Sequence, residues 1–363
     1  MTFHDATAGY EAWLGGFGPL DAADLDFKHA QMADAADPFP FFRGTYYRWA
    51  QLWPEVCGDL NDAPKVLAVG DLHVENFGTW RDGDGRLCWG VNDFDEADTL
   101  PYANDLVRLA ASVLFARKAD AAGGLKAVKF KAACEAILSG YGDALRAGGD
   151  PFVLEERHPG LRALAMSADR DPVEFWRKLT KVLATPAVEP PKAARAALTA
   201  DLPAADLAPE FRRRPRVGVG SLGKARYVAL AQWGGGWVAR DAKAVTPPAT
   251  AWVAGDARPS RMAEAVKRAK RCPDPFYRAG PAWVARRLGP RCSRVELGEL
   301  GTAADVTELL RAMGAEAANV HLGDRNSAAI LGDLAGRPAG WLADAARAIE
   351  DAVAADWAAW RHG

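Results

Sequence analysis

The sequence lacks the cysteine patterns that build disulfide frameworks or structural zinc sites. It contains only five cysteines, an odd number, and no two of them stand in a CxxC arrangement. A disulfide-stabilised secreted domain and a zinc-stabilised domain are therefore both disfavoured, and a reducing cytoplasm fits this usage better. The five are Cys57, Cys88, Cys134, Cys272 and Cys292.

Long hydrophobic runs and a strong net charge are also missing. The longest apolar stretches, such as LAASVLFA, are far shorter than the ~20 residues that span a bilayer. The first residues carry no basic segment followed by an apolar one, so we expect no secretory signal peptide. The formal net charge of −2 gives no indication of a nucleic-acid or membrane partner.

The composition that remains is that of a globular protein large enough for two lobes. Hydrophobic residues make up 49% and charged residues 25% of the 363 residues. A segment rich in proline, alanine and charge, at about 186–216, predicts a connection between lobes. We therefore expect an α+β protein with a helical lobe, 1–205, a smaller antiparallel-sheet lobe, 206–299, and C-terminal helices, 300–363, that return to the helical lobe.

The spacing of apolar residues predicts helices and strands along most of the chain. A short apolar run, KVLAVG at 65–70, indicates a buried strand, and RDGDGR at 81–86 indicates a hairpin turn. The glycine-punctuated segment 217–245 is predicted to hold three strands, and further strand is expected within 281–300. Helices are expected within 1–60, at 105–119, 130–147, 171–184 and 260–271, and in two stretches after 303.

Three polar residues are spaced in a way that suits metal-dependent phosphoryl transfer. Asp71 and Asn76 form a D-x-x-x-x-N pattern in GDLHVENFG, and Asp93 follows in NDFDEA. A strand, a short loop and a hairpin would bring all three to one end of a sheet. Phosphoryl transfer needs an aspartate near the acceptor hydroxyl and metal ions on the phosphates, and magnesium prefers oxygen ligands. The alternative is that these side chains only cap helices or line solvated turns.

Other side chains near these motifs are open to two interpretations. Asp95 and Glu96 are extra carboxylates beside the metal motif. His73 either supports the site or is a buried histidine with a backbone partner. Asp105 suits a loop-bracing hydrogen bond or a helix cap better than chemistry. Arg43, in FFRG, either reaches the active site or forms a structural salt bridge.

A glycine-rich motif stands later in the chain. Gly218, Gly220 and Gly223 form a G-x-G-x-x-G sequence followed by a stretch with strand character. A dinucleotide-binding turn would lead into a helix, so this order favours a strand–loop–strand that covers nucleotide phosphates. Glycines let backbone N–H groups approach phosphate oxygens closely, although a surface hairpin would use the same residues.

A lysine and its neighbours extend this second motif. Lys243 lies in a strand-like stretch and suits the lysine that pairs the α- and β-phosphates of ATP in kinases. Glu264, on the next predicted helix, suits the ion-pair partner of that lysine. Ser221 and Arg226 are placed to touch phosphate. Each of these four residues has a plain alternative as a solvated surface residue.

The motifs resemble two known groups of proteins. GDLHVEN with NDFDEA is similar to the catalytic and metal loops of aminoglycoside phosphotransferase-type kinases, whose pattern is GDLHxxN followed by IDF or IDW. FFRG, GDLHVENFG, VNDFDEADTLPYANDLVRLAAS, GVGSLGKARY and ARDAKAV together resemble the bacterial family called domain of unknown function 2252, over about residues 35–325. The first resemblance implies a kinase-like fold, with Asp71 as the catalytic-loop aspartate and Asn76 and Asp93 as metal ligands.

The order of the motifs departs from that of ordinary kinases. In kinases the glycine loop and lysine precede the catalytic and metal loops, whereas here they follow them. A circular permutation reconciles the two orders, and AMGAEAANVHLGD resembles the helix that leads into the kinase catalytic loop. The departure leaves the partner of the lysine and the orientation of ATP open. Nucleotidyl transfer, as in selenoprotein-O-like pseudokinases, therefore stays an alternative.

The sequence predicts an ATP-dependent phosphotransferase that uses Mg²⁺ or Mn²⁺ and acts on an unidentified small-molecule or protein acceptor. One rival is a metal-dependent phosphoesterase, which would need additional histidines such as His321. Another is an inactive nucleotide-binding protein, which would be expected to have lost part of the motif set. The predicted site comprises Asp71 and His73 for catalysis, Gly218, Gly220, Ser221, Gly223, Lys243 and Glu264 for the nucleotide, and Asn76, Asp93 and Asp95 for the metal.

Overall fold

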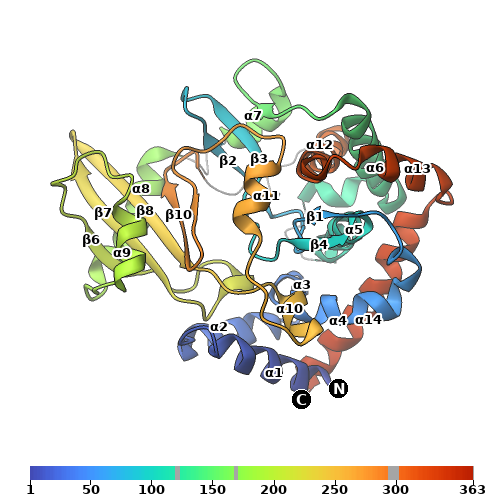
Figure 1. The fold of residues 1–363 in the computed structure, drawn as a ribbon, viewed down its shortest axis with the longest axis horizontal. Helices are drawn as coiled ribbons and strands as arrows, with labels where there is room; N and C mark the ends of the chain where they lie inside the picture. Colours follow the sequence, from blue (N-terminus) through green and yellow to red (C-terminus); the bar gives the residue numbers. More distant parts are fainter. Residues whose placement is uncertain (119–122, 167–170, 293–301, 363) are drawn as a thin grey trace.

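Most helices of the protein form one body, and a five-stranded sheet lies to one side of it (Figure 1). The computed structural model describes residues 1–118, 123–166, 171–292 and 302–362. The expected α+β class with antiparallel sheets is confirmed. The helices outside the five-stranded sheet are α1 Phe3–Gly15, α2 Ala22–Met32, α3 Phe39–Gly44, α4 Tyr46–Val56, α5 Tyr102–Lys118, α6 Phe130–Ala147, α7 Pro159–Ala165, α10 Ala249–Ala254, α11 Met262–Arg268, α12 Ala303–His321, α13 Ser327–Gly336 and α14 Trp341–His362.

The five-stranded sheet is antiparallel, with the strand order β6-β7-β8-β10-β9. Its first three strands follow one another in the chain, and the last two exchange places. The strands are β6 Glu210–Arg213, β7 Arg226–Trp233, β8 Gly236–Ala244, β9 Arg278–Ala279 and β10 Trp283–Leu288.

Two helices that precede the sheet in the chain cover its two faces. Val228 of β7 packs with α8, Pro172–Thr180, whereas its neighbour Ala229 packs with Leu198 of α9, Lys192–Thr199. Successive residues of a strand point to opposite faces, so α8 and α9 lie on opposite sides of the sheet. From the sequence, α8 was expected as a helix within 1–205, whereas the residues of α9 fell in the predicted connection at about 186–216. Their apolar sides bury the two faces of the sheet.

Two smaller sheets lie within the helical body and position the first motif. β1 Lys65–Ala68 pairs with β4 Asp98–Pro101. β2 Phe77–Arg81 and β3 Leu87–Val91 form a hairpin, and β5 Phe152–Val153 adds to β3. The predicted strand in KVLAVG and the predicted hairpin around RDGDGR are confirmed.

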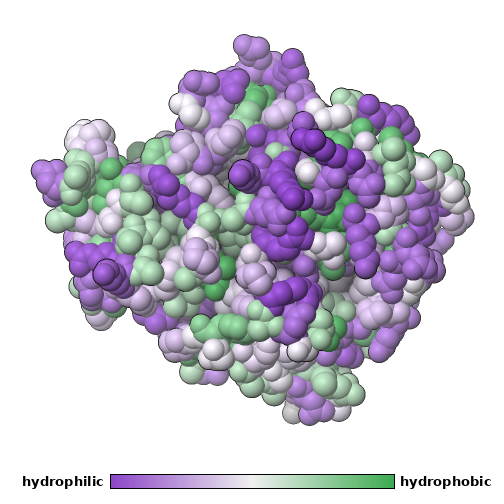
Figure 2. Space-filling view, viewed as in Figure 1, coloured by the Kyte–Doolittle hydropathy of each residue, from purple (hydrophilic) through white to green (hydrophobic). Residues whose placement is uncertain are grey.

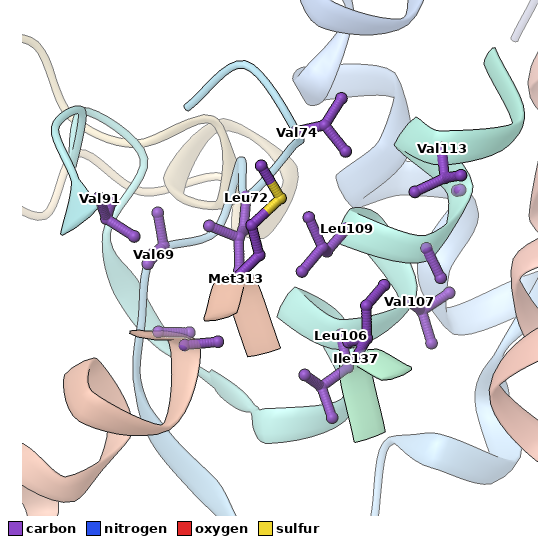
Figure 3. Close-up of a cluster of buried hydrophobic side chains, with 14 of the residues drawn as sticks. Val69, Leu72, Val74, Val91, Leu106, Val107, Leu109, Val113, Ile137 and Met313 are labelled. Atoms are coloured by element: carbon purple, nitrogen blue, oxygen red, sulfur yellow. The ribbon is translucent and has the colours of Figure 1, made fainter. Parts of the chain in front are cut away.

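The GDLHVENFG loop is held from below by the main hydrophobic core (Figure 3). Leu72 and Val74 of this loop are buried. They lie among side chains of α5 and α12, including Leu109 and Met313 (Figure 3). Burying these two apolar side chains fixes the loop backbone and leaves its polar residues for the surface of a cavity.

The glycine-punctuated segment holds two strands rather than the predicted three. β7 and β8 form the expected hairpin, but residues 219–221 form a short 3₁₀ turn. Arg216 and Gly218 have positive φ angles of 57° and 76°, which are incompatible with a continuous strand. The third strand of this meander is β6, which lies in the predicted connection. The predicted strand in SRVELGEL, 293–300, lies outside the described residues.

The C-terminal helix α14 packs against α1, α4 and α5 and brings the two ends of the chain close together (Figure 1). It has 22 residues, but charged side chains recur along it. No helix in the described ranges combines the length and the apolar character needed to cross a membrane.

Candidate active site

The three polar residues of the first motif converge on one cavity. Asp71 lies in the loop after β1, Asn76 directly precedes β2, and Asp93 follows β3. Asn76 Nδ2 donates a hydrogen bond to the Asp71 carbonyl oxygen at 2.9 Å, and the Asn92 backbone N–H donates to the Asn76 carbonyl oxygen at 3.0 Å. These bonds tie the end of β3 to the loop after β1, so all three residues of the motif line the same cavity.

Asp105 and Gly70 fix the turn that follows β1. The carboxylate of Asp105, on α5, accepts hydrogen bonds from the backbone N–H groups of Val69 at 2.7 Å and Gly70 at 2.9 Å. The ring of His321 pairs with the same carboxylate at 3.0 Å. Gly70 has a φ of 82°, and a Cβ there would lie 2.3 Å from the carbonyl oxygen of Glu96, so a side chain is excluded. The loop-bracing role expected for Asp105 is confirmed.

Asp71 forms a buried ion pair with Arg108, on α5. Asp71 Oδ1 accepts hydrogen bonds from Arg108 Nε at 2.9 Å and Nη2 at 2.7 Å. The guanidinium is 1% exposed and lies 3.7 Å from the ring centroid of Phe42 and 4.7 Å from that of Trp49. Burial raises the pKa of Asp71 above its ordinary value, although Arg108 opposes the rise. Arg108 therefore fixes one carboxylate oxygen of Asp71 without making the group a weak base.

Lys243, on β8, joins the sheet to the metal-binding motif. Its Nζ lies 2.6 Å from Asp95 Oδ2 and 3.3 Å from Asp93 Oδ1. Desolvation by the surrounding protein would raise the pKa of the half-exposed Asp93, but Lys243, Asp95 and Arg286 together outweigh it and hold that pKa below its ordinary range. Burial and repulsion from Asp93 raise the pKa of Asp95. Two carboxylates thus face one ammonium, which leaves negative charge for a second cation.

The glycine turn covers the same cavity. Gly218, Gly220 and Ser221 all line it. A Cβ at Gly220 would lie 3.9 Å from Asp71 Oδ2 and 3.2 Å from the carbonyl oxygen of Arg43. The turn therefore passes close to Oδ2 of Asp71, the carboxylate oxygen that Arg108 does not hold.

Two residues assigned to the nucleotide do not reach this cavity. Gly223 has a φ of 92°, and a Cβ there would lie 2.7 Å from Leu25, so this glycine serves packing against α2. Glu264, on α11, pairs with Arg261 at 2.7 Å and Arg268 at 2.9 Å. The surface over α11 is hydrophilic (Figure 2), which suits these solvated ion pairs. The expected pairing of Glu264 with the lysine of β8 is replaced by these local pairs, because that lysine already has two carboxylate partners.

His73 and Arg43 line the cavity and also have structural partners. His73 Nδ1 accepts a hydrogen bond from the Glu75 backbone N–H at 3.2 Å, and its ring lies edge-on to Phe39. Arg43 Nη1 pairs with Glu75 Oε2 at 2.5 Å. Each of these residues therefore lines the cavity while a neighbour fixes its orientation.

Two buried oxygen atoms near the cavity, Asn76 Oδ1 and Asp95 Oδ1, have no hydrogen-bond partner among the described residues. With Asp93, they supply the amide and carboxylate oxygens that Mg²⁺ and Mn²⁺ prefer, so the residues present fit such an ion. The described residues contain a compact group of three possible metal ligands, Asp82, Cys88 and Cys272, but this group does not line the cavity. A cation here would therefore need the Asn76 amide and oxygens from water or substrate.

A comparison with known families covers residues 20–362 of the chain. A family described as an uncharacterized protein conserved in bacteria (DUF2252) matches residues 20–171 and 162–362. The protein belongs to the DUF2252 family. The resemblance drawn from FFRG, GDLHVENFG and the later motifs is thereby confirmed. Neither the curated proteins nor the solved structures contain a match to this DUF2252 chain.

Several cavity and support residues of this DUF2252 protein, among them Arg108, Tyr10 and Tyr46, went unassigned in the sequence. Arg108 carried a signal, because an arginine inside the apolar run LVRLAAS needs a buried partner. Tyr10 and Tyr46 line the cavity from the N-terminal helices, and nothing in their sequence context separates them from core aromatic residues. Burial raises the pKa of Glu96, which also lines the cavity, to about 7, opposed by nearby Lys224.

Proposed function

We propose that this DUF2252 protein is an ATP-dependent phosphotransferase that uses Mg²⁺ or Mn²⁺ and acts on a hydroxyl acceptor of unidentified class. One observation carries the proposal. Lys243 Nζ lies 3.3 Å from Asp93 Oδ1 although 150 positions separate the two residues. Kinases place a lysine and a metal-binding aspartate around the phosphates of one nucleotide, and one nucleotide can contact both residues here.

The five-stranded sheet supports this proposal. The glycine turn joins β6 to β7, and Lys243 lies on β8, the third strand of the sheet in chain order. In protein kinases a glycine loop covers the phosphates and the lysine lies on the third strand. The motif order then reflects a circular permutation of a kinase-like fold, which the close ends of the chain would permit (Figure 1).

The metal would be held by Asn76, Asp93 and Asp95. When bound, it would neutralise charge on phosphate oxygens. The cavity has a volume of about 70 Å³, which suits an ion with a few waters rather than a whole nucleotide. Lys243 now pairs with both carboxylates, so we expect nucleotide entry to move it from Asp95 to the phosphates.

Asp71 is the candidate that orients the acceptor hydroxyl and takes its proton late in the reaction. Arg108 holds Oδ1, so Oδ2 is the atom available to accept the hydroxyl hydrogen. The raised pKa of Asp71, caused by burial, makes this carboxylate a better base than a solvated aspartate. The positions of Asp71 and of the glycine turn agree with a mechanism based on positioning and electrostatics.

Nucleotidyl transfer is the second candidate, favoured by the partners of Lys243. In protein kinases this lysine pairs with a helix glutamate, whereas here it pairs with Asp93 and Asp95. A nucleotide in another orientation would then present its α-phosphate to an acceptor. The phosphoesterase rival is weakened because His321 is buried and pairs with Tyr141 and Asp105, away from the metal-binding candidates.

Incubation with ATP labelled at either the α- or the γ-phosphate tests the proposal. Candidate acceptors are added together with Mg²⁺ or Mn²⁺, and water is the acceptor of last resort. Movement of the γ-label alone, abolished by Asp93→Ala, is the expected result. Movement of the α-label to the acceptor would favour nucleotidyl transfer. Absence of both transfer and metal-dependent ATP binding would overturn both candidates.

A further inference from the structure

Two cysteines lie close together on the far side of the metal-binding motif. Cys88 lies on β3, whose end leads to Asp93, and Cys272 lies in the segment between α11 and β9. The two sulfur atoms and a carboxylate oxygen of Asp82 all lie within 4.8 Å of one another. Cys88 is buried, whereas Cys272 is partly exposed. The pair thus combines one sulfur that solvent can reach with one that it cannot.

The segment that carries Cys272 is already docked on the β2–β3 hairpin. Trp80 Nε1 donates a hydrogen bond to the Cys272 carbonyl oxygen at 2.9 Å. Arg271 Nη1 donates to the Val91 carbonyl oxygen at 2.8 Å, and its guanidinium stacks on Trp80. These contacts hold the two cysteine-bearing segments side by side, with the sulfur atoms within 4.8 Å of each other, whereas a disulfide needs ~2.05 Å.

We propose that Cys88 and Cys272 form a reversible intramolecular disulfide when the protein meets a peroxide. The bond would tie β3 to the chain between α11 and β9, at a modification site separate from the ATP cavity. In a reducing compartment such a bond is transient and redox-sensing rather than structural. The proposal does not depend on the phosphotransferase assignment.

A soft-metal site fits the same residues less well. Both carboxylate oxygens of Asp82, the third possible ligand, already accept hydrogen bonds from Arg86, at 2.9 Å from its backbone N–H and 2.8 Å from Nε. Arg86 Nη2 also lies 3.8 Å from Cys272 Sγ. The guanidinium therefore stands where a cation would bind, which leaves the two sulfur atoms as the reactive pair.

The reaction proceeds in two balanced steps. The Cys272 thiolate attacks a peroxide oxygen, an S–O bond forms, the O–O bond breaks and hydroxide leaves, so that sulfur is oxidised to sulfenic acid. Cys88 then loses its proton and attacks this sulfur, the S–S bond forms, the S–O bond breaks and hydroxide leaves as water. Burial raises the pKa of the Cys88 thiol, which leaves the partly exposed Cys272 as the thiol that meets the peroxide first.

Peroxide treatment of the full chain, followed by alkylation and peptide mapping, tests this proposal. The expected result is a fall from five to three alkylated cysteines, a mass loss of two hydrogen atoms and one peptide linking Cys88 to Cys272. A thiol reductant should restore all five. Cys272→Ser should abolish the linkage, whereas Cys292→Ser, a second partly exposed cysteine, should retain it.

Three outcomes would overturn the proposal. In the first, the linked peptide contains a different pair of cysteines or joins two chains. In the second, all five cysteines are still alkylated after treatment with peroxide doses that oxidise free thiols. In the third, zinc added to the reduced protein binds in a one-to-one complex that protects Cys88 and Cys272 from alkylation and is lost in Cys88→Ser. Because the wild-type peptide map alone decides the first two outcomes, a variant that fails to fold leaves the test intact.

Discussion

Asp71 and Lys243 illustrate two ways in which a single charge is positioned in this protein. Asp71 has one buried partner, Arg108, whose guanidinium is enclosed by aromatic rings. Lys243 pairs with two carboxylates of the cavity, those of Asp93 and Asp95, and the Asp93 side chain is 47% exposed. The first arrangement is rigid, whereas the second can exchange partners when a charged ligand enters. The two residues should therefore respond differently to substitution.

Replacing Asp71 by asparagine should lower turnover by roughly 10²-fold or more, in line with general-base contributions of ~10²–10⁴. Asparagine keeps an oxygen that can accept from Arg108 but has no basic carboxylate. Nucleotide affinity should therefore change little, although the lost ion pair with Arg108 should reduce thermal stability measurably. Turnover of γ-labelled ATP and calorimetric ATP binding measure the two effects on the same preparation.

Lys243→Ala provides the comparison for this variant, because it should weaken both nucleotide binding and turnover. Full activity in Asp71→Asn, together with loss of activity in Lys243→Ala, would show that Asp71 is not the catalytic base. The nucleotidyl-transfer candidate would then move ahead.

At the scale of helices, α6 and α12 approach so closely that their backbones touch. A Cβ at Gly140 would lie 1.8 Å from the Arg311 carbonyl oxygen, and one at Gly314 would lie 2.0 Å from the Ile137 carbonyl oxygen. Each glycine therefore faces the backbone of the other helix. This crossing places α12 against β3, the strand that leads to Asp93.

Gly314→Ala should destabilise the protein by roughly 1–3 kcal/mol, because the added methyl group forces the two helices apart. Gly332→Ala, on α13, is the matched control. A Cβ at Gly332 meets no atom within 4 Å, so helix propensity should make this change neutral or stabilising by up to about 1 kcal/mol. Denaturant unfolding of both variants measures the difference. Equal stabilities would contradict the close helix crossing.

Glu316 connects α12 to β3 through a buried carboxyl group whose pKa is raised. Its Oε1 accepts a hydrogen bond from the Val91 backbone N–H at 3.2 Å, and its Oε2 accepts one from Asn319 Nδ2 at 2.9 Å. Burial raises the pKa of Glu316 from 4.5 to about 7, although Arg271 and these hydrogen bonds oppose the rise. The folded protein therefore binds this proton more tightly than the unfolded chain does.

A raised carboxyl pKa has a defined effect on stability. The contribution of Glu316 is fully present below its unfolded pKa of 4.5 and is lost as pH rises through about 7. Glu316→Gln should remove this contribution. Between pH 4.5 and about 7 the free energy of unfolding of wild type should fall by on the order of 3 kcal/mol more than that of the variant. The exposed Glu135→Gln serves as control. Parallel pH profiles for wild type and Glu316→Gln would contradict the assignment.

At the scale of the whole molecule, the sequence predicted residues that lie near one another along the chain better than partners from distant segments. Asp71, Asn76 and Asp93 are separated only by short loops and a hairpin, so strand and turn patterns suffice to bring them together. The partners of Glu264 could not be predicted in this way. Several arginines and lysines surround it in the sequence, and its final pairing depends on how α11 docks.

The placement of α8 and α9 shows the same limit at a larger scale. Their amphipathic pattern predicts that each helix buries one side, but it does not say against which surface. Both faces of the five-stranded sheet carry small and branched apolar side chains, including Ala229 and Val228, which are buried only when a helix packs against each face. The Asp71–Arg108 ion pair was not predicted for the same reason, because only the docking of α5 against the loop after β1 brings the two side chains together.

ATP binding measured by calorimetry with and without Mg²⁺ tests the central claim most directly, namely that Lys243 and the Asp93 motif hold one metal–nucleotide complex. Wild type should bind ATP at least about tenfold more tightly with Mg²⁺ than with a chelator, a difference of ~1.4 kcal/mol or more. Asp93→Ala should lose this metal dependence, whereas Asp84→Ala, at the exposed turn of the same hairpin, should retain it. Equal ATP affinity with and without metal in wild type, or full metal dependence in Asp93→Ala, would contradict the account.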